Sequence, residues 1–171
     1  MTMTAPILNI ADVETIDLAE RSRQRGSDRM PTERFGGRIG PIGPKVGARR
    51  LGYNLTIVEP GKAAFPKHSH YVNEEMFFIL DGTGELRLGD AVHPVRAGDV
   101  IACPPGGPET AHQLFNTGSV DLRYLAVSSM DFPEICEYPD SGKFLAMSGM
   151  PPGAFRTLGR TADGLDYWDG E

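Results

Sequence analysis

Residues 61–84 read GKAAFPKHSHYVNEEMFFILDGTG, and this stretch does most to define the fold. It contains a His-Ser-His triplet in a segment of β type, followed after a short bend by a second β-type run that begins at Glu75. Side chains two positions apart on a strand share a face, so His68 and His70 are expected to point the same way. The stretch therefore predicts two strands that direct two imidazoles and one carboxylate into a common interior.

A second stretch, residues 98–116, reads GDVIACPPGGPETAHQLFN and supplies a further histidine. Alternation along its last part places His112 on one face with Leu114 and Asn116. The fourth histidine, His93, is followed by proline in a polar hairpin and is not expected in the site. Three of the four histidines therefore occupy inward positions on strands that a barrel would bring together.

The predicted site is a metal centre formed by His68, His70, Glu75 and His112. Three neutral imidazoles and one carboxylate suit a divalent metal ion and leave positions open for water or substrate. The neighbouring Glu74 is an alternative carboxylate ligand. Glu75 is preferred because alternation puts it on the face that carries the apolar side chains of the same run.

The chain beyond Arg50 is a series of short β-type runs separated by turn signals. Asp-Gly-Thr-Gly at 81–84, for example, favours a tight hairpin. Eight strands are predicted, near residues 51–59, 67–71, 75–80, 84–88, 91–94, 99–103, 111–116 and 122–128. Strands of this number and length predict an all-β fold, a jelly roll or a closed barrel.

The two stretches resemble the two motifs of the cupin superfamily. The matching positions are Gly61, His68, His70, Glu75 and Gly82 in the first motif, and Gly98, Pro104, Gly106, His112 and Asn116 in the second. The resemblance implies a double-stranded β-helix that holds one divalent metal ion (Zn, Fe, Mn or Ni) on the four ligands. One extra residue in the first motif and three in the loop before His112 lengthen turns without removing a ligand.

Within the superfamily, the sequence is most similar to small bacterial single-domain cupins, some of which are labelled sugar-phosphate isomerases by analogy. Shared phrases include NEEMFFILDGTGELRL and EYPDSGK. The resemblance implies a metal-dependent enzyme that acts on a small oxygen-rich molecule such as a sugar phosphate. An Fe-dependent dioxygenase and a non-catalytic small-molecule binding cupin remain alternatives. Glu74, Tyr71 and Tyr124 are conceivable bases, and no catalytic residue is assigned.

The length of 171 residues favours one domain with extensions at both ends. We divide the chain into an N-terminal arm (1–50), a barrel (51–129) and a C-terminal extension (130–171). The arm is expected to contain one short helix within 12–25 and a turn-rich extended connector over 36–47. The extension is expected to pack on the barrel or on a partner subunit, because its Tyr and Trp need cover.

The formal net charge of −6 conceals an asymmetry along the chain. Residues 21–50 contain nine Lys or Arg and two acidic residues, so the remainder is strongly acidic. This basic arm could bind a phosphorylated ligand or nucleic acid, but it has few aromatics and no single basic face. We favour an arm that lies on the acidic barrel of its own or a partner subunit. The expected partners are a small-molecule ligand and a second copy in a homodimer, with neither nucleic acid nor membrane.

The sequence also carries signals for the cellular location, for the state of the two cysteines and for the loop before His112. The longest apolar run, 76–80, is too short to cross a bilayer, and no secretory signal is evident, so a cytoplasmic protein is expected. Cys103 and Cys136 are expected to be reduced, buried thiols. The stiff loop that begins at Pro104 is expected to border the cavity mouth and to present Glu109 and Thr110 to a substrate, or else to be a surface turn.

Overall fold

The protein is described by a computed structural model that covers residues 6–149 and 153–171. Its strands are β1 (Ile16–Asp17), β2 (Arg38–Pro41), β3 (Leu51–Val58), β4 (Ser69–His70), β5 (Glu75–Asp81), β6 (Thr83–Leu88), β7 (Ala91–Arg96), β8 (Val100–Cys103), β9 (His112–Phe115), β10 (Leu122–Ser129), β11 (Glu134–Tyr138), β12 (Lys143–Met147) and β13 (Arg156–Arg160). One α-helix, α1 (Leu18–Gln24), and five short 3-10 turns complete these elements. Among the described residues there is no helix long and apolar enough to span a membrane.

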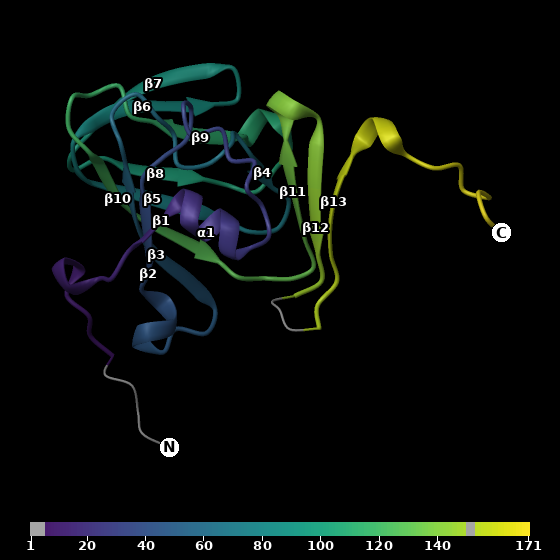
Figure 1. Cartoon of the computed structure of the whole chain (residues 1–171), viewed down its shortest axis with the longest axis horizontal. Coiled ribbons are helices and arrows are strands. Elements are labelled where there is room, and N and C mark those ends of the chain that lie inside the picture. Colours follow the sequence, from purple (N-terminus) through teal and green to yellow (C-terminus); the bar gives the residue numbers. More distant parts are fainter. Residues whose placement is uncertain (1–5, 150–152) are drawn as a thin grey trace.

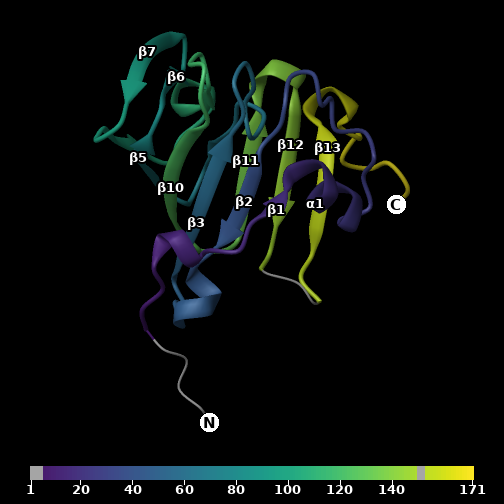
Figure 2. The same ribbon diagram turned by 60° about the vertical axis from the view of Figure 1, so that its left-hand side comes forward.

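The strands form three antiparallel sheets that enclose the core (Figure 1). The largest has the order β1-β2-β3-β10-β5-β8, and it faces a three-stranded sheet with the order β7-β6-β9. A four-stranded sheet, β13-β12-β11-β4, stands beside them, and Figure 2 shows β11, β12 and β13 side by side. This arrangement confirms the predicted all-β class and the double-stranded β-helix.

The two faces of the largest sheet are covered by different parts of the chain. Its inner face contributes Val58, Phe77, Ile79 and Tyr124 to the main core, which also receives Leu18 of α1. Its outer face carries a second apolar cluster of Val13, Leu55 and Ile57, against which Leu8 and Ile10 pack. The N-terminal arm therefore covers both sides of β3 instead of lying free on the surface.

The expected strands between residues 51 and 129 are present, with one marked difference. The segment predicted as 67–71 contains only the two-residue strand β4. His68, just before it, forms an isolated bridge with His112, while β4 pairs with β11. The chain changes neighbours at this point, so a long continuous strand cannot form.

The arm contains more sheet than the sequence suggested. The helix expected within 12–25 begins only at Leu18, because the Asp17 side chain caps it by accepting hydrogen bonds from two main-chain N–H groups. The connector over 36–47 includes β2, which pairs with β3. Close approach of the two strands depends on Gly37, with φ of +128°, because a Cβ there would lie 2.0 Å from the Ile57 carbonyl oxygen.

The C-terminal extension is largely a sheet and supplies three strands, of which β11 pairs with β4 beside the predicted site. The aromatic end is different, since Tyr167 and Trp168 are 84% and 72% exposed. Their rings contact each other, with centroids 4.9 Å apart. The parent barrel does not cover these two side chains in the single chain, and cover by a partner subunit stays a prediction.

Candidate metal centre

The structure brings the four predicted ligand side chains together. One carboxylate oxygen of Glu75, Oε2, lies 3.0 Å from Nε2 of His112, 3.7 Å from Nε2 of His70 and 3.9 Å from Nε2 of His68. One ligand atom from each of the four residues lies within 4.8 Å of every other. Such a group of nitrogen and oxygen atoms could hold a metal ion.

Main-chain pairing fixes the places of these side chains. The backbone N–H of His112 donates to the His68 carbonyl at 2.8 Å, and the reverse bond is 3.1 Å long. Glu75 begins β5, which lies between β10 and β8 in the sheet. The cluster thus stands on backbone that is hydrogen-bonded on both sides, which limits how far the ligand atoms can separate.

Hydrogen bonds at the far side of two rings set their tautomers. Nδ1 of His68 lies 2.8 Å from the Pro66 carbonyl oxygen, and Nδ1 of His112 lies 3.2 Å from that of Thr110. A carbonyl oxygen can only accept, so each Nδ1 carries a proton and each Nε2 would present its lone pair to a bound ion. In the absence of an ion, Nε2 of His112 forms a hydrogen bond with Glu75 Oε2. The same pattern of second hydrogen bonds orients histidines that bind metals.

This donor set fits a cation. Lone pairs on Nε2 and a carboxylate oxygen repel one another unless a proton or a metal ion lies between them. A hydrogen bond links Glu75 to His112, while Nε2 of His70 and His68 lie 3.7 and 3.9 Å from the carboxylate. In addition, Nε2 of His70 is buried and has no hydrogen-bond partner within the part of the chain that the structure describes. Three nitrogens and one carboxylate are ligands that Zn²⁺, Fe²⁺, Mn²⁺ and Ni²⁺ all accept, so the geometry leaves the identity of the metal open.

The charge states of the cluster also suit a metal. Burial, reinforced by the neighbouring His112, lowers the pKa of His68 to about 4, so this ring is neutral at pH 7. Burial alone would raise the pKa of Glu75, but the hydrogen bond with His112 and the nearby imidazoles outweigh it and hold that pKa below its usual value. A neutral imidazole and an ionised carboxylate are the forms in which these residues bind metal ions.

Strand β11 adds three residues that sequence reasoning missed. Cys136 is paired in register with His70, and its Sγ lies 3.3 Å from the ring Nδ1. Glu134 Oε2 lies 3.5 Å from the same nitrogen, so these three residues form a second group that could hold a metal ion. Tyr138 stacks on His68 with ring centroids 6.0 Å apart. The signal was the alternation of Glu134, Cys136 and Tyr138, which places all three on one face.

Glu134 is the most heavily hydrogen-bonded of these residues. It is 1% exposed and accepts backbone N–H bonds from Tyr71 (3.1 Å), Val72 (3.2 Å), Asn73 (3.0 Å) and Ile135 (2.8 Å). The side-chain amide of Asn73 donates to it as well. The carboxylate therefore fixes the bend between β4 and β5, the bend that sets His70 against Glu75.

The choice between the two adjacent glutamates is resolved, because Glu74 is exposed and Glu75 lies in the cluster. Tyr71 is also exposed, and its hydroxyl donates to Glu137. Tyr124, in contrast, is buried and lines a cavity of about 20 Å³ beside His68 and His112. Of the three conceivable bases, only Tyr124 borders the cluster.

The loop before His112 meets the site through its main chain. Its Gly106 N–H donates to the His70 carbonyl, and the Thr110 carbonyl orients His112. The Glu109 carboxylate is exposed and accepts from Gly107, and neither Glu109 nor Thr110 lines the cavity. The expectation that these two side chains face a substrate is not supported. The loop positions the His112 ring instead.

Both cysteines are free and buried, as expected. Cys103 is paired in register with Glu75 and so borders the cluster. Burial, with a contribution from Glu75, raises its pKa to about 12. Burial likewise raises the pKa of Cys136 to about 12. Both thiols are therefore protonated at neutral pH and act as packing groups in the absence of a metal.

Comparison with known proteins places this geometry in a family. A family model described as a cupin domain matches residues 54–128. Protein SchB of Streptomyces halstedii is 30% identical over 98 residues, which cover 56% of this chain. The chain spans 46% and 68% of the lengths of the first two curated relatives that it matches.

Two solved structures have similar folds over most of their length. One, from Acidithiobacillus ferrooxidans, is named as a proposed sugar phosphate isomerase; it is 27% identical, with a TM-score of 0.68, and the match covers 77% of this chain and 80% of that one. The other is a sugar phosphate isomerase from a cupin superfamily of Silicibacter pomeroyi, with a TM-score of 0.71 over 96% and 98% of the chains. At 22% identity, the second similarity supports the fold alone.

Replacement of the buried carboxylate tests its structural role. Glu134→Gln replaces one acceptor oxygen by a donor that faces main-chain N–H groups, so the free energy of unfolding of the metal-free protein should fall by about 1–3 kcal/mol. Urea denaturation measures the change. The matched variant Glu137→Gln lies on the same strand, where the carboxylate accepts from Tyr71 at the surface, and should change stability by less than about 0.5 kcal/mol. Equal effects of the two variants would contradict this assignment.

Proposed function

The chain belongs to the cupin family, and from this premise we propose that it is a metal-dependent enzyme that acts on a small oxygen-rich molecule such as a sugar phosphate. One observation carries the proposal: His68, His70, Glu75 and His112 each offer an atom that could bind a metal ion, and these atoms lie within 4.8 Å of one another. The name of the Acidithiobacillus structure supports an isomerase-like reaction for this site.

The protein groups around the cluster suit proton movement on a bound carbonyl or hydroxyl compound. A divalent ion held by the four ligands would polarise such an oxygen as a Lewis acid. Tyr124 lines the adjoining cavity, and burial raises its pKa well above the usual range, so the phenol stays protonated and can donate a hydrogen bond to that oxygen. Phe77 and Leu114, which line the same cavity, exclude water from that oxygen.

A second candidate is an iron-dependent dioxygenase, and the cavity favours it. Its volume of about 20 Å³ and its lining by Phe65, Phe77 and Leu114 suit a small apolar molecule such as dioxygen beside the cluster. Three imidazoles and a carboxylate with open positions also suit Fe(II). The two candidates differ in whether turnover consumes oxygen.

Metal binding by the four residues is the first test. The purified protein should bind one divalent ion per chain, as measured by elemental analysis. His70→Ala should weaken that binding by at least about 100-fold, because removing a direct metal ligand costs more affinity than removing a residue that only hydrogen-bonds to a ligand. Circular dichroism should show an unchanged fold. His93→Ala is the matched control, since His93 is exposed on β7, and it should bind metal as the wild type does. Unchanged affinity in His70→Ala would contradict the site.

Oxygen dependence separates the two candidate reactions. The metal-loaded protein should interconvert aldose and ketose phosphates at the same rate with and without air, and an oxygen electrode should record no consumption. Product analysis by NMR provides the rate. Oxygen uptake that depends on added Fe(II) would instead support the dioxygenase. Ligand binding without turnover under either condition would indicate a non-catalytic binding protein.

We also propose that the protein forms a homodimer that uses its exposed C-terminal aromatics. Tyr167, Trp168 and Leu158 are exposed, and β13 is an edge strand of its sheet. Light scattering should give twice the chain mass of 18.6 kDa at micromolar concentration, and the double variant Tyr167→Ser, Trp168→Ser should give a monomer. A monomeric wild-type protein would contradict the proposal.

A further inference from the structure

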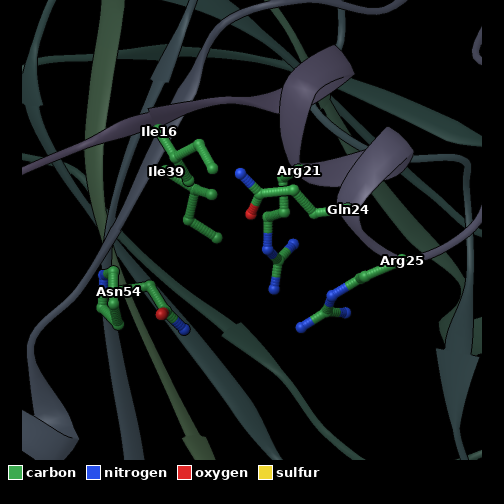
Figure 3. Close-up of a pocket in the computed structure, with 7 residues that line it drawn as sticks. Ile16, Arg21, Gln24, Arg25, Ile39 and Asn54 are labelled. Atoms are coloured by element: carbon green, nitrogen blue, oxygen red, sulfur yellow. The ribbon is translucent and has the colours of Figure 1, made fainter.

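A second cavity lies away from the histidine cluster, between α1 and the strands β2 and β3 (Figure 3). Its volume is about 280 Å³, close to the lower end of the range for small-molecule sites, which begins near about 300 Å³. It is lined by Ile16, Arg21, Gln24, Arg25, Ile39, Pro41 and Asn54. The lining thus combines two guanidinium groups and two amides with an apolar floor.

Both guanidinium groups are directed into this cavity. Figure 3 shows Arg21, on α1, and Arg25, directly after the helix, extending into the same space, with the amide of Asn54 on the opposite side. Leu18, earlier on α1, is buried in the main core and anchors the helix there. The two arginines are therefore presented by an anchored element and not by a free arm.

The positive charge in this cavity is not compensated by the protein. Within residues 6–149 and 153–171, neither Arg21 nor Arg25 forms an ion pair, whereas Arg23 on the same helix pairs with Glu20 at 2.8 Å. Arg21 is only partly exposed, and burial together with the charge on Arg25 lowers its pKa. Two like charges side by side, one of them partly buried, repel each other, and an anion between them offsets that repulsion.

The cavity and the histidine cluster share one face of the largest sheet. In the register of that sheet, Asn54 lies opposite Ala126, and Ala126 lies opposite Phe77. Neighbouring strands are about 4.8 Å apart, so Asn54 is roughly 10 Å from Phe77 along this row. Glu75 is two residues from Phe77 and points to the same side. A phosphorylated sugar can span this distance.

We propose that Arg21 and Arg25, assisted by Asn54, bind the phosphate group of the ligand whose oxygen-rich end lies at the histidine cluster. Phosphate binding by the two arginines does not depend on the proposed function. Only the position of the ligand's oxygen-rich end at the histidine cluster rests on it. Two guanidinium forks match a dianionic phosphate in charge and in hydrogen-bond geometry. The basic arm thereby has a defined task, which is to select phosphorylated molecules for the barrel.

Inorganic phosphate is the probe that tests the site. Binding is measured by calorimetric titration of the full-length protein. Treatment with a chelator beforehand excludes phosphate binding to a metal ion, and low ionic strength limits screening of the arginine charges. The wild type should bind one phosphate per chain. Arg21→Gln and Arg25→Gln should each weaken binding by at least about tenfold, because each loses charge-assisted hydrogen bonds.

Arg23→Gln is the matched control. It lies on the same helix and removes the same charge, but its side chain is 56% exposed and paired with Glu20, so phosphate affinity should change by less than about twofold. Arg25 is exposed, so its variant gives an answer even if Arg21→Gln fails to fold.

The outcomes distinguish this site from the proposed metal function. Loss of phosphate binding in the Arg21 and Arg25 variants alone supports the site, whether or not the wild type binds a metal. Equal weakening by all three arginine variants would show a general charge effect and overturn the inference. A wild-type protein that binds metal but not phosphate would overturn the inference while leaving the metal centre intact.

Discussion

The convergence of four potential ligand atoms at the centre of the barrel is the constraint on which the rest of the structure depends. The carbonyl oxygens of Pro66 and Thr110 hold protons on the far sides of two imidazoles, which turns each Nε2 toward the Glu75 carboxylate. A hydrogen bond joins Nε2 of His112 to this carboxylate, while Nε2 of His70 and His68 lie 3.7 and 3.9 Å from it. Paired backbone holds the side chains in these positions, where one cation could accept all four donors. The fold is therefore a frame that keeps four donors within reach of one ion.

Each part of the chain contributes to that frame. The barrel supplies the four ligand side chains, and the extension supplies β11, whose Glu134 ties down the bend before Glu75. The arm places α1 over the inner face of the largest sheet, next to the row that leads to Phe77. Division into arm, barrel and extension describes the order of the sequence, but the histidine cluster and the arginine-lined cavity together draw on all three segments.

The clustering of the candidate ligands could be predicted from the sequence because a strand has a period of two, which places His68 with His70 and Glu75 with Phe77 without any knowledge of partners. The contribution of β11 could not, since Cys136 meets His70 only through a pairing between strands 66 positions apart in the chain. The same applies to Arg21 and Arg25. Their charge is visible in the sequence, but the cavity that they share exists only when α1 is placed against β2 and β3.

Anomalous diffraction from crystals of the protein loaded with a divalent transition metal tests this account most directly. The account predicts one anomalous peak per chain, about 2.0–2.2 Å from Nε2 of His68, His70 and His112 and close to the Glu75 carboxylate. A peak at the group of His70, Glu134 and Cys136 instead, or crystals without a peak in which His112 points away from Glu75, would contradict it.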